Sequence, residues 1–121
     1  MPYRTHFDPE HDLIEVTYFG SLTPADLERA AHEILEQLAQ RGFKRVLADC
    51  SSIEGGHSVF DLYALADWLS THASHLKEAV VVPVQGLAAD KVEFWETTCQ
   101  NRGLLVRLFH ERQEALAWLC G

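Results

Sequence analysis

Short apolar runs alternate with amphipathic helical patterns along the chain, and this alternation constrains the fold more than any other feature. Two of the runs, Arg45 to Cys50 and Ala79 to Val84, are nearly continuous, which is typical of strands covered on both faces. Strands that alternate with helices form right-handed βαβ units, so we expect a mostly parallel sheet. The sequence therefore predicts one α/β domain over all 121 residues, in the order β-β-α-β-α-β-α-β-α.

The first 41 residues predict a hairpin followed by a helix. Tyr3–Phe7 and the apolar run from Leu13 to Gly20 flank a turn-rich segment, Asp8–Asp12, so the two runs are expected to pair as antiparallel strands. Thr23 precedes a proline and has an acid three residues after it, which is typical of a helix start. Apolar residues then recur at helical spacing and predict a helix over residues 24–41. They are Leu27, Ala30, Ala31, Ile34, Leu35 and Leu38.

The rest of the chain predicts three further helices and a last strand. Ser51–His57 is predicted as a loop, and Ser58 with Asp61 forms a capping pair that starts the second helix. The core stripe of that helix is expected to be Leu62, Leu65, Ala66 and Leu69. The later elements are predicted as a helix from about Ala89 to Arg102, a strand from Leu104 to Phe109 and a helix from Glu111 to Leu119.

Charge and composition exclude several classes of protein. Ten Lys and Arg residues against 18 Asp and Glu give a formal net charge of −8, which disfavours nucleic acid and anionic lipid as partners. The longest strongly apolar stretch, Ala79 to Val84, is far shorter than a membrane span, and the N-terminus lacks the apolar core of a signal peptide. Three widely spaced cysteines form no disulfide framework. We therefore expect a cytoplasmic protein that does not insert stably into membranes.

Four short pieces of sequence occur in a distinctive order. They are Phe19–Pro24, Val46–Asp49, Phe60–Tyr63 and Asn101–Gly103, the last followed by Val106, Phe109, Ala115, Trp118 and Leu119. Together they resemble the STAS-like, SpoIIAA-like family of anti-sigma-factor antagonists, and more closely its small stand-alone STAS/SEC14-type bacterial members. The resemblance implies a five-stranded SpoIIAA-like (STAS) fold. It also implies a non-enzymatic regulatory module that binds a protein partner or associates with itself.

In the signalling members of that family, a serine of an Asp-Ser-Ser/Thr-Gly motif at the start of the second helix is phosphorylated. A phosphate at a helix N-terminus meets unpaired N–H groups and a favourable dipole, and it can redirect binding at that end of the domain. Ser58 stands at the corresponding place, but the surrounding residues, Gly55 to Phe60, lack the motif. The alternative interpretation of Ser58 is an ordinary N-cap.

Two sets of residues are candidates for binding. Ligands of open α/β sheets bind outside the carboxyl ends of the strands, and the residues expected there are Asp49, Ser51, Ser52, His57 and Ser58. Aromatic side chains that flank or oppose the core stripe of the second helix are expected to form a partner surface. They are Phe60, Tyr63 and Trp68. The alternatives are that Asp49 caps turn amides and that a loop or the neighbouring helix covers the aromatics.

Catalytic and metal-binding motifs are missing from the sequence. It contains no Gly-x-Ser-x-Gly, Walker, Gly-x-Gly-x-x-Gly or His-Glu-x-x-His pattern. Cys50 is the one candidate nucleophile, but a buried cysteine usually serves packing. Glu28, His32 and Glu36 share a helix face away from the apolar stripe and are interpreted as solvated. We expect no enzyme activity, cofactor or metal. A second hypothesis is a SEC14-like carrier of lipid or another small apolar ligand.

Overall fold

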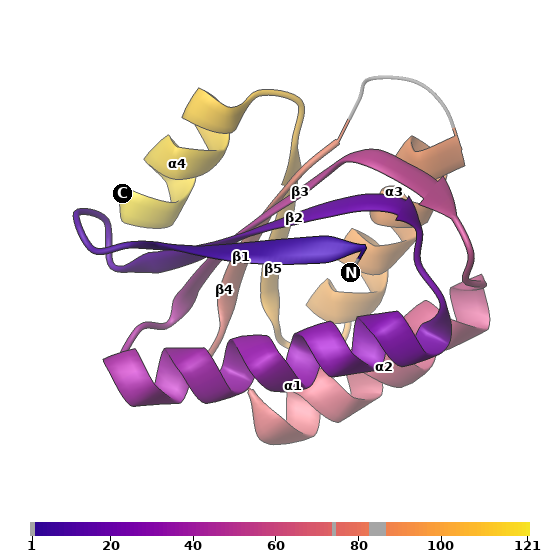
Figure 1. Ribbon diagram of the computed structural model, residues 1–121, viewed down its shortest axis with the longest axis horizontal. Coiled ribbons are helices and arrows are strands. Elements are labelled where there is room, and N and C mark those ends of the chain that lie inside the picture. Colours follow the sequence, from indigo (N-terminus) through magenta and orange to yellow (C-terminus); the bar gives the residue numbers. More distant parts are fainter. Residues whose placement is uncertain (1, 74, 83–86) are drawn as a thin grey trace.

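The computed structural model describes residues 2–73, 75–82 and 87–121. Within these residues the chain forms the predicted succession of strands and helices (Figure 1). The strands are β1 (Tyr3–Asp8), β2 (Leu13–Ser21), β3 (Arg45–Gly55), β4 (Lys77–Val81) and β5 (Leu105–Phe109). The helices are α1 (Pro24–Arg41), α2 (Val59–His72), α3 (Leu87–Gln100) and α4 (Arg112–Cys120). The α/β fold class is confirmed.

The strands form one five-stranded sheet in the order β1-β2-β3-β4-β5. Among the strands that the structure describes, only the β1–β2 pair is antiparallel, as the predicted hairpin requires. The sequence leaves this strand order open. Because right-handed crossovers that advance steadily in one direction keep their helices on one side, α1, α2 and α3 cover the same face. Helix α4 follows the edge strand β5 and returns over the opposite face (Figure 1). We call these the α1–α3 face and the α4 face.

Side chains alternate between the two faces along the central strands. Val46, Ala48 and Cys50 of β3 belong to the large core under α1, α2 and α3. Leu47, which lies between them, belongs to a smaller cluster under α4. Successive side chains of β3 point to opposite faces, and both faces are covered by helices. The start of β3 is therefore a continuous apolar run.

Capping residues place the ends of α1 and α2 where the sequence predicts them. The Thr23 side chain accepts a hydrogen bond from the Asp26 backbone N–H, and the Asp26 carboxylate accepts one from Thr23. Ser58 and Asp61 form the same reciprocal box at α2. Helix α1 ends at Gly42, whose left-handed backbone (φ 71°) lets its N–H donate to Leu38. No helix in the described ranges is long and apolar enough to cross a bilayer.

The largest departure from prediction is at the end of β3. The sequence predicts a loop over residues 51–57, and this is wrong up to Gly55, because the strand continues that far. Phe19 of β2 pairs with Ser52 between two register shifts, and the Leu22 N–H donates to the Gly55 carbonyl at 2.7 Å. A turn-rich composition does not prevent a strand when a neighbouring strand supplies hydrogen bonds.

Strand β4 begins earlier than predicted. It spans Lys77–Val81, whereas the sequence predicts a strand from Ala79 to Val84. Pro83 and Val84 lie outside the described residues. The shift brings Glu78 into the strand, where the sequence alone gives no reason to expect a carboxylate.

Candidate functional site

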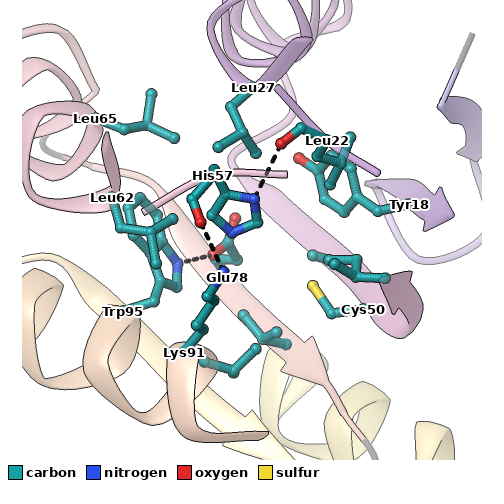
Figure 2. A pocket seen from close by; sticks show the side chains of 14 residues that line it. Tyr18, Leu22, Leu27, Cys50, His57, Leu62, Leu65, Glu78, Lys91 and Trp95 are labelled. Carbon is teal, nitrogen blue, oxygen red and sulfur yellow. Dashed lines mark hydrogen bonds between the residues drawn. The ribbon is translucent and has the colours of Figure 1, made fainter. Parts of the chain in front are cut away.

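A cavity of about 80 Å³ lies between the α1–α3 face of the sheet and the helices (Figure 2). Its walls are largely aliphatic, and they come from the central strands of the sheet and from the three helices on that face. They include Leu22, Leu27, Ala48, Leu62, Leu65 and Val92. One water fills roughly 10–15 Å³ of such space. The cavity therefore has room for a ligand of only a few atoms.

Glu78 of β4 is the acidic group of the cavity. The Trp95 indole N–H of α3 donates to Glu78 Oε1 at 2.8 Å (Figure 2). Burial raises the pKa of Glu78 to about 7, and the hydrogen bond from Trp95 offsets only part of that shift. Glu78 can therefore gain or lose a proton near neutral pH, inside a mostly apolar space.

Three other ionisable side chains near Glu78, those of Tyr18, Cys50 and Cys99, stay neutral. Burial raises the pKa of Tyr18 and of the Cys50 and Cys99 thiols, and the charge on Glu78 raises each of them further. Cys50 lies within β3, five residues before its end, and is buried. A thiol held in its protonated form is a poor nucleophile. The geometry therefore supports a packing role for Cys50.

His57 and Lys91 form the roof of the cavity. His57 Nδ1 lies 3.1 Å from the Leu22 carbonyl oxygen, and the Lys91 ammonium donates to the His57 carbonyl at 2.6 Å. Burial lowers the pKa of His57, so the neutral ring donates its Nδ1–H to Leu22. These contacts join the segment before α1, the segment before α2 and the first turns of α3 (Figure 2).

Of the five candidates at the strand ends, only His57 lines the cavity. Asp49 accepts hydrogen bonds from the Ser51 backbone N–H at 3.0 Å and from its hydroxyl at 2.6 Å. Asp49 follows Leu47 by two residues along β3 and so lies on the α4 face. Ser52 is exposed on the β3 extension, and Ser58 caps α2. The five residues therefore do not form one site.

The three aromatic candidates on α2 have different surroundings. Phe60 exposes 82% of its surface, Tyr63 51%, and the neighbouring Val59 42%. The Arg102 guanidinium lies 4.1 Å above the Tyr63 ring and covers only part of it. We call Val59, Phe60 and Tyr63 the α2 patch. It leaves two aromatic side chains open to solvent at the start of α2.

Trp68 is not part of the α2 patch. It is half-buried between His32 of α1 and His72 of α2, with ring centroids 4.4 and 4.7 Å away. It also lines a groove of about 280 Å³ between α1 and α2. The neighbouring helix therefore partly covers Trp68, as the alternative interpretation requires, whereas most of the Phe60 side chain is exposed within the described part of the chain.

The turn between β1 and β2 brings three metal-ligand types together. Donor atoms of Asp8, Glu10 and His11 all lie within 4.8 Å of one another. The His11 ring is already hydrogen-bonded to the Asp8 carboxylate at 2.7 Å, which lowers the pKa of Asp8. Because this internal pair and an exposed glutamate account for the grouping, the turn has no feature beyond those of a polar hairpin loop.

Sequence reasoning missed most polar residues of the cavity, namely Tyr18, Glu78 and Lys91. They come from three separate elements, and no short motif contains them. One signal was available, because Glu78 directly precedes the apolar run that starts at Ala79. An acid at the edge of a buried strand must be either at the surface or in a pocket.

Comparisons with known proteins agree with this architecture. The profile of the SpoIIAA-like family matches residues 13–120. Among solved structures, the chain is similar to the crystal structure of an uncharacterised protein of the DUF3478 family with a SpoIIAA-like fold, from Shewanella loihica PV-4. The two share 22% sequence identity, the match covers 98% of this chain and 93% of that one, and the TM-score is 0.61. No curated protein matches the chain.

Proposed function

The chain belongs to the SpoIIAA-like family, and from this premise we propose that it is a non-enzymatic binding module that recognises a partner protein through the start of α2. The exposure of Phe60, 82% of its surface, carries the proposal. Tyr63 and Val59 extend the same apolar surface. Aromatic side chains in such a position commonly anchor protein interfaces, because burying them removes a large apolar area from water.

The surroundings of the α2 patch favour a stable docking surface. Ser58 and Asp61 fix the first turn of α2, since the Ser58 hydroxyl donates to Asp61 Oδ2 at 3.0 Å and accepts from its N–H at 3.3 Å. Only Gly56 and His57 lie between β3 and this cap, so the proposed surface is the helix start rather than a long loop. The patch is therefore held in place before a partner arrives.

A phosphorylation switch gains no support from the geometry. The Ser58 hydroxyl is already engaged in the capping box with Asp61. A phosphate there would bring nearly two negative charges next to that carboxylate. Ser58 is accordingly assigned the role of an N-cap that orients the α2 patch.

Affinity capture with matched variants tests the partner surface. Immobilised wild type, Phe60→Ala and Leu105→Ala would be compared on lysate of the source cells, followed by binding of the captured protein in purified form. Leu105 is the control because it is a large exposed apolar residue, 58% exposed, on β5. We expect a partner that binds wild type and Leu105→Ala and is lost with Phe60→Ala. Equal binding to all three would contradict the proposal.

Self-association through the same patch is examined in parallel. Sedimentation velocity over a range of concentrations would show a dimer in the wild type and in Leu105→Ala but only a monomer in Phe60→Ala. If the dimer also survives Phe60→Ala, the α2 patch is not the dimer contact.

The cavity favours a second candidate function, a carrier of a small apolar ligand. A cavity of about 80 Å³ with mainly aliphatic walls is suited to a compact molecule and too small for a lipid chain. Native mass spectrometry of freshly purified protein would detect a retained ligand. The variant Leu65→Phe, which narrows the cavity at a half-buried position, would release it. An unliganded mass in the wild type together with no uptake of small apolar probes would contradict the carrier function.

A further inference from the structure

We propose that the cavity selects a small primary aliphatic amine of roughly six heavy atoms, whose ammonium group pairs with the carboxylate of Glu78. The inference rests on the carrier function proposed above for the same cavity and adds the chemical class of the ligand. Three observations support it: the hydrogen bonding of Glu78, the missing counter-charge, and the size and polarity of the walls.

The protein fills only part of the hydrogen-bonding capacity of the Glu78 carboxyl group. Its Oε1 accepts the Trp95 indole N–H at 2.8 Å. Within residues 2–73, 75–82 and 87–121, no other hydrogen bond reaches the side chain of Glu78, and this side chain lines the cavity. A carboxylate has about four acceptor positions on its two oxygens. The second oxygen is thus available to a donor inside the cavity.

No positive side chain of the described residues balances Glu78. The Lys91 ammonium is directed at the His57 carbonyl, 2.6 Å away, at the roof of the cavity. His57 is held neutral by burial, and Tyr18 of β2 and Cys50 of β3 are uncharged neighbours. Glu78 is half-buried beside a mostly apolar space, and a carboxylate withdrawn from water is normally paired, because an unpaired one loses part of its hydration. A ligand ammonium would supply the positive charge that the protein does not.

The size and polarity of the cavity walls indicate which alkyl group the ligand carries beside its ammonium group. About 80 Å³ corresponds to roughly six water-sized atoms, and the surrounding side chains are mainly Leu, Val and Ala. A short branched alkyl chain fills such a space and gains from its removal from water. A carboxylic acid of the same shape would place a second acidic group next to Glu78, and an alcohol would lack the charge. The expected order of affinity is therefore amine, then alcohol, then acid.

Three probes with one carbon skeleton test this order: isopentylamine, isopentanol and isovaleric acid. Each would be titrated into the full chain at pH 8, where Glu78 is ionised because this pH exceeds its pKa of about 7. The readout is the Trp95 indole resonance in ¹H–¹⁵N NMR, with Trp68 and Trp118 as internal controls that lie outside the cavity. We expect a saturable shift of the Trp95 resonance, with the amine at least about tenfold tighter than the alcohol.

The variant Glu78→Gln separates charge from shape. It keeps the volume and an acceptor oxygen but cannot carry a charge. We expect Glu78→Gln to bind the amine no more tightly than the alcohol, with its Trp68 and Trp118 resonances unchanged as evidence of folding. Leu65→Phe should weaken all three probes together.

The outcomes distinguish the inference from the carrier function. If wild type binds the alcohol as tightly as the amine, or binds the acid best, the amine inference is overturned while the carrier function stands. If the amine keeps its preference in Glu78→Gln, the assignment to Glu78 is overturned. If no probe moves the Trp95 resonance, both the inference and the carrier function fail, and the partner surface on α2 is unaffected.

Discussion

On the α4 face of the sheet, Leu13, Leu47 and Ala79 from three neighbouring strands pack against Ala115 and Leu119 of α4, and none is more than 1% exposed. On the α1–α3 face, a larger core of buried residues surrounds a cavity and a partly satisfied carboxyl group. The residues of the cluster under α4 are almost completely buried, whereas the core under α1, α2 and α3 is larger and contains a cavity with polar groups.

The difference follows from how the two faces are covered. One helix lying along two or three strands can settle until its side chains fill the space beneath it. Three helices joined to the ends of successive strands are fixed at those ends, and the space between them is filled only as far as their side chains reach. The polar and open side of a sheet of this kind is therefore the side on which to look for ligand binding.

Truncating a leucine on each face is the most severe test of the comparison. Leu47→Ala creates a new void in the closely packed α4 face and should lower the free energy of unfolding by about 4 kcal/mol. Leu62→Ala enlarges a cavity that already exists, so the loss should be about 2 kcal/mol, because Leu62 has fewer partner atoms on its cavity side. Urea unfolding of both variants measures this. Equal losses would show that the two faces are packed alike.

The glycine that precedes His57 gives the next largest effect. Gly56 has φ +96°, and a Cβ there would lie 2.7 Å from the Leu22 backbone. Gly56→Ala should therefore cost about 3 kcal/mol, from backbone strain plus the contact with Leu22. Thermal and urea unfolding would measure the loss.

Gly103 is the matched control, since it has φ +78° and open space around its Cβ position. Gly103→Ala should cost only about 1 kcal/mol, which is the strain of a left-handed alanine. If both glycine variants lose the same free energy of unfolding, the close approach of Gly56 to Leu22 adds nothing to the cost of a side chain at Gly56.

The pH dependence of the free energy of unfolding measures the burial of Glu78. Its expected size is smaller than the effects of Leu47→Ala and Gly56→Ala. The pKa of Glu78 is about 7 in the folded protein against an ordinary 4.5, so the folded state holds the proton more tightly than the unfolded chain. The stabilisation is complete below pH 4.5 and is lost as the pH rises through 7. Between pH 5 and pH 8, wild type should lose about 2 kcal/mol relative to Glu78→Gln, which cannot ionise.

His57 must be separated from this measurement. Burial lowers its pKa, so it contributes stability that is lost as the pH falls, which is the opposite direction. Because His57 is present in both proteins, the difference between wild type and Glu78→Gln in urea unfolding isolates the carboxyl group. A difference that stays constant from pH 5 to pH 8 would mean that Glu78 is solvated like a surface residue.

Much of the fold was predictable from local sequence. The caps at Thr23 and Ser58 and the helix over residues 24–41 are confirmed, because each depends on neighbours within a few positions. The mostly parallel sheet is confirmed as well, because it follows from the alternation of strands and helices along the chain. The extension of β3 to Gly55 was not predictable, since residues 51–55 become a strand only through pairing with β2. The spacing on α2 identified Phe60 as a residue off the core stripe, and the structure shows its exposure.

The order of the elements, their caps and the positions of the apolar side chains follow from spacing along the chain. Which of these side chains share one space follows from packing between elements. This packing placed Asp49 away from His57, covered Trp68 with His32, and brought Glu78 to Trp95 across 17 residues. The physical reason is that burial and pairing of charged groups depend on packing between distant segments, for which strand register and crossover direction set the geometry.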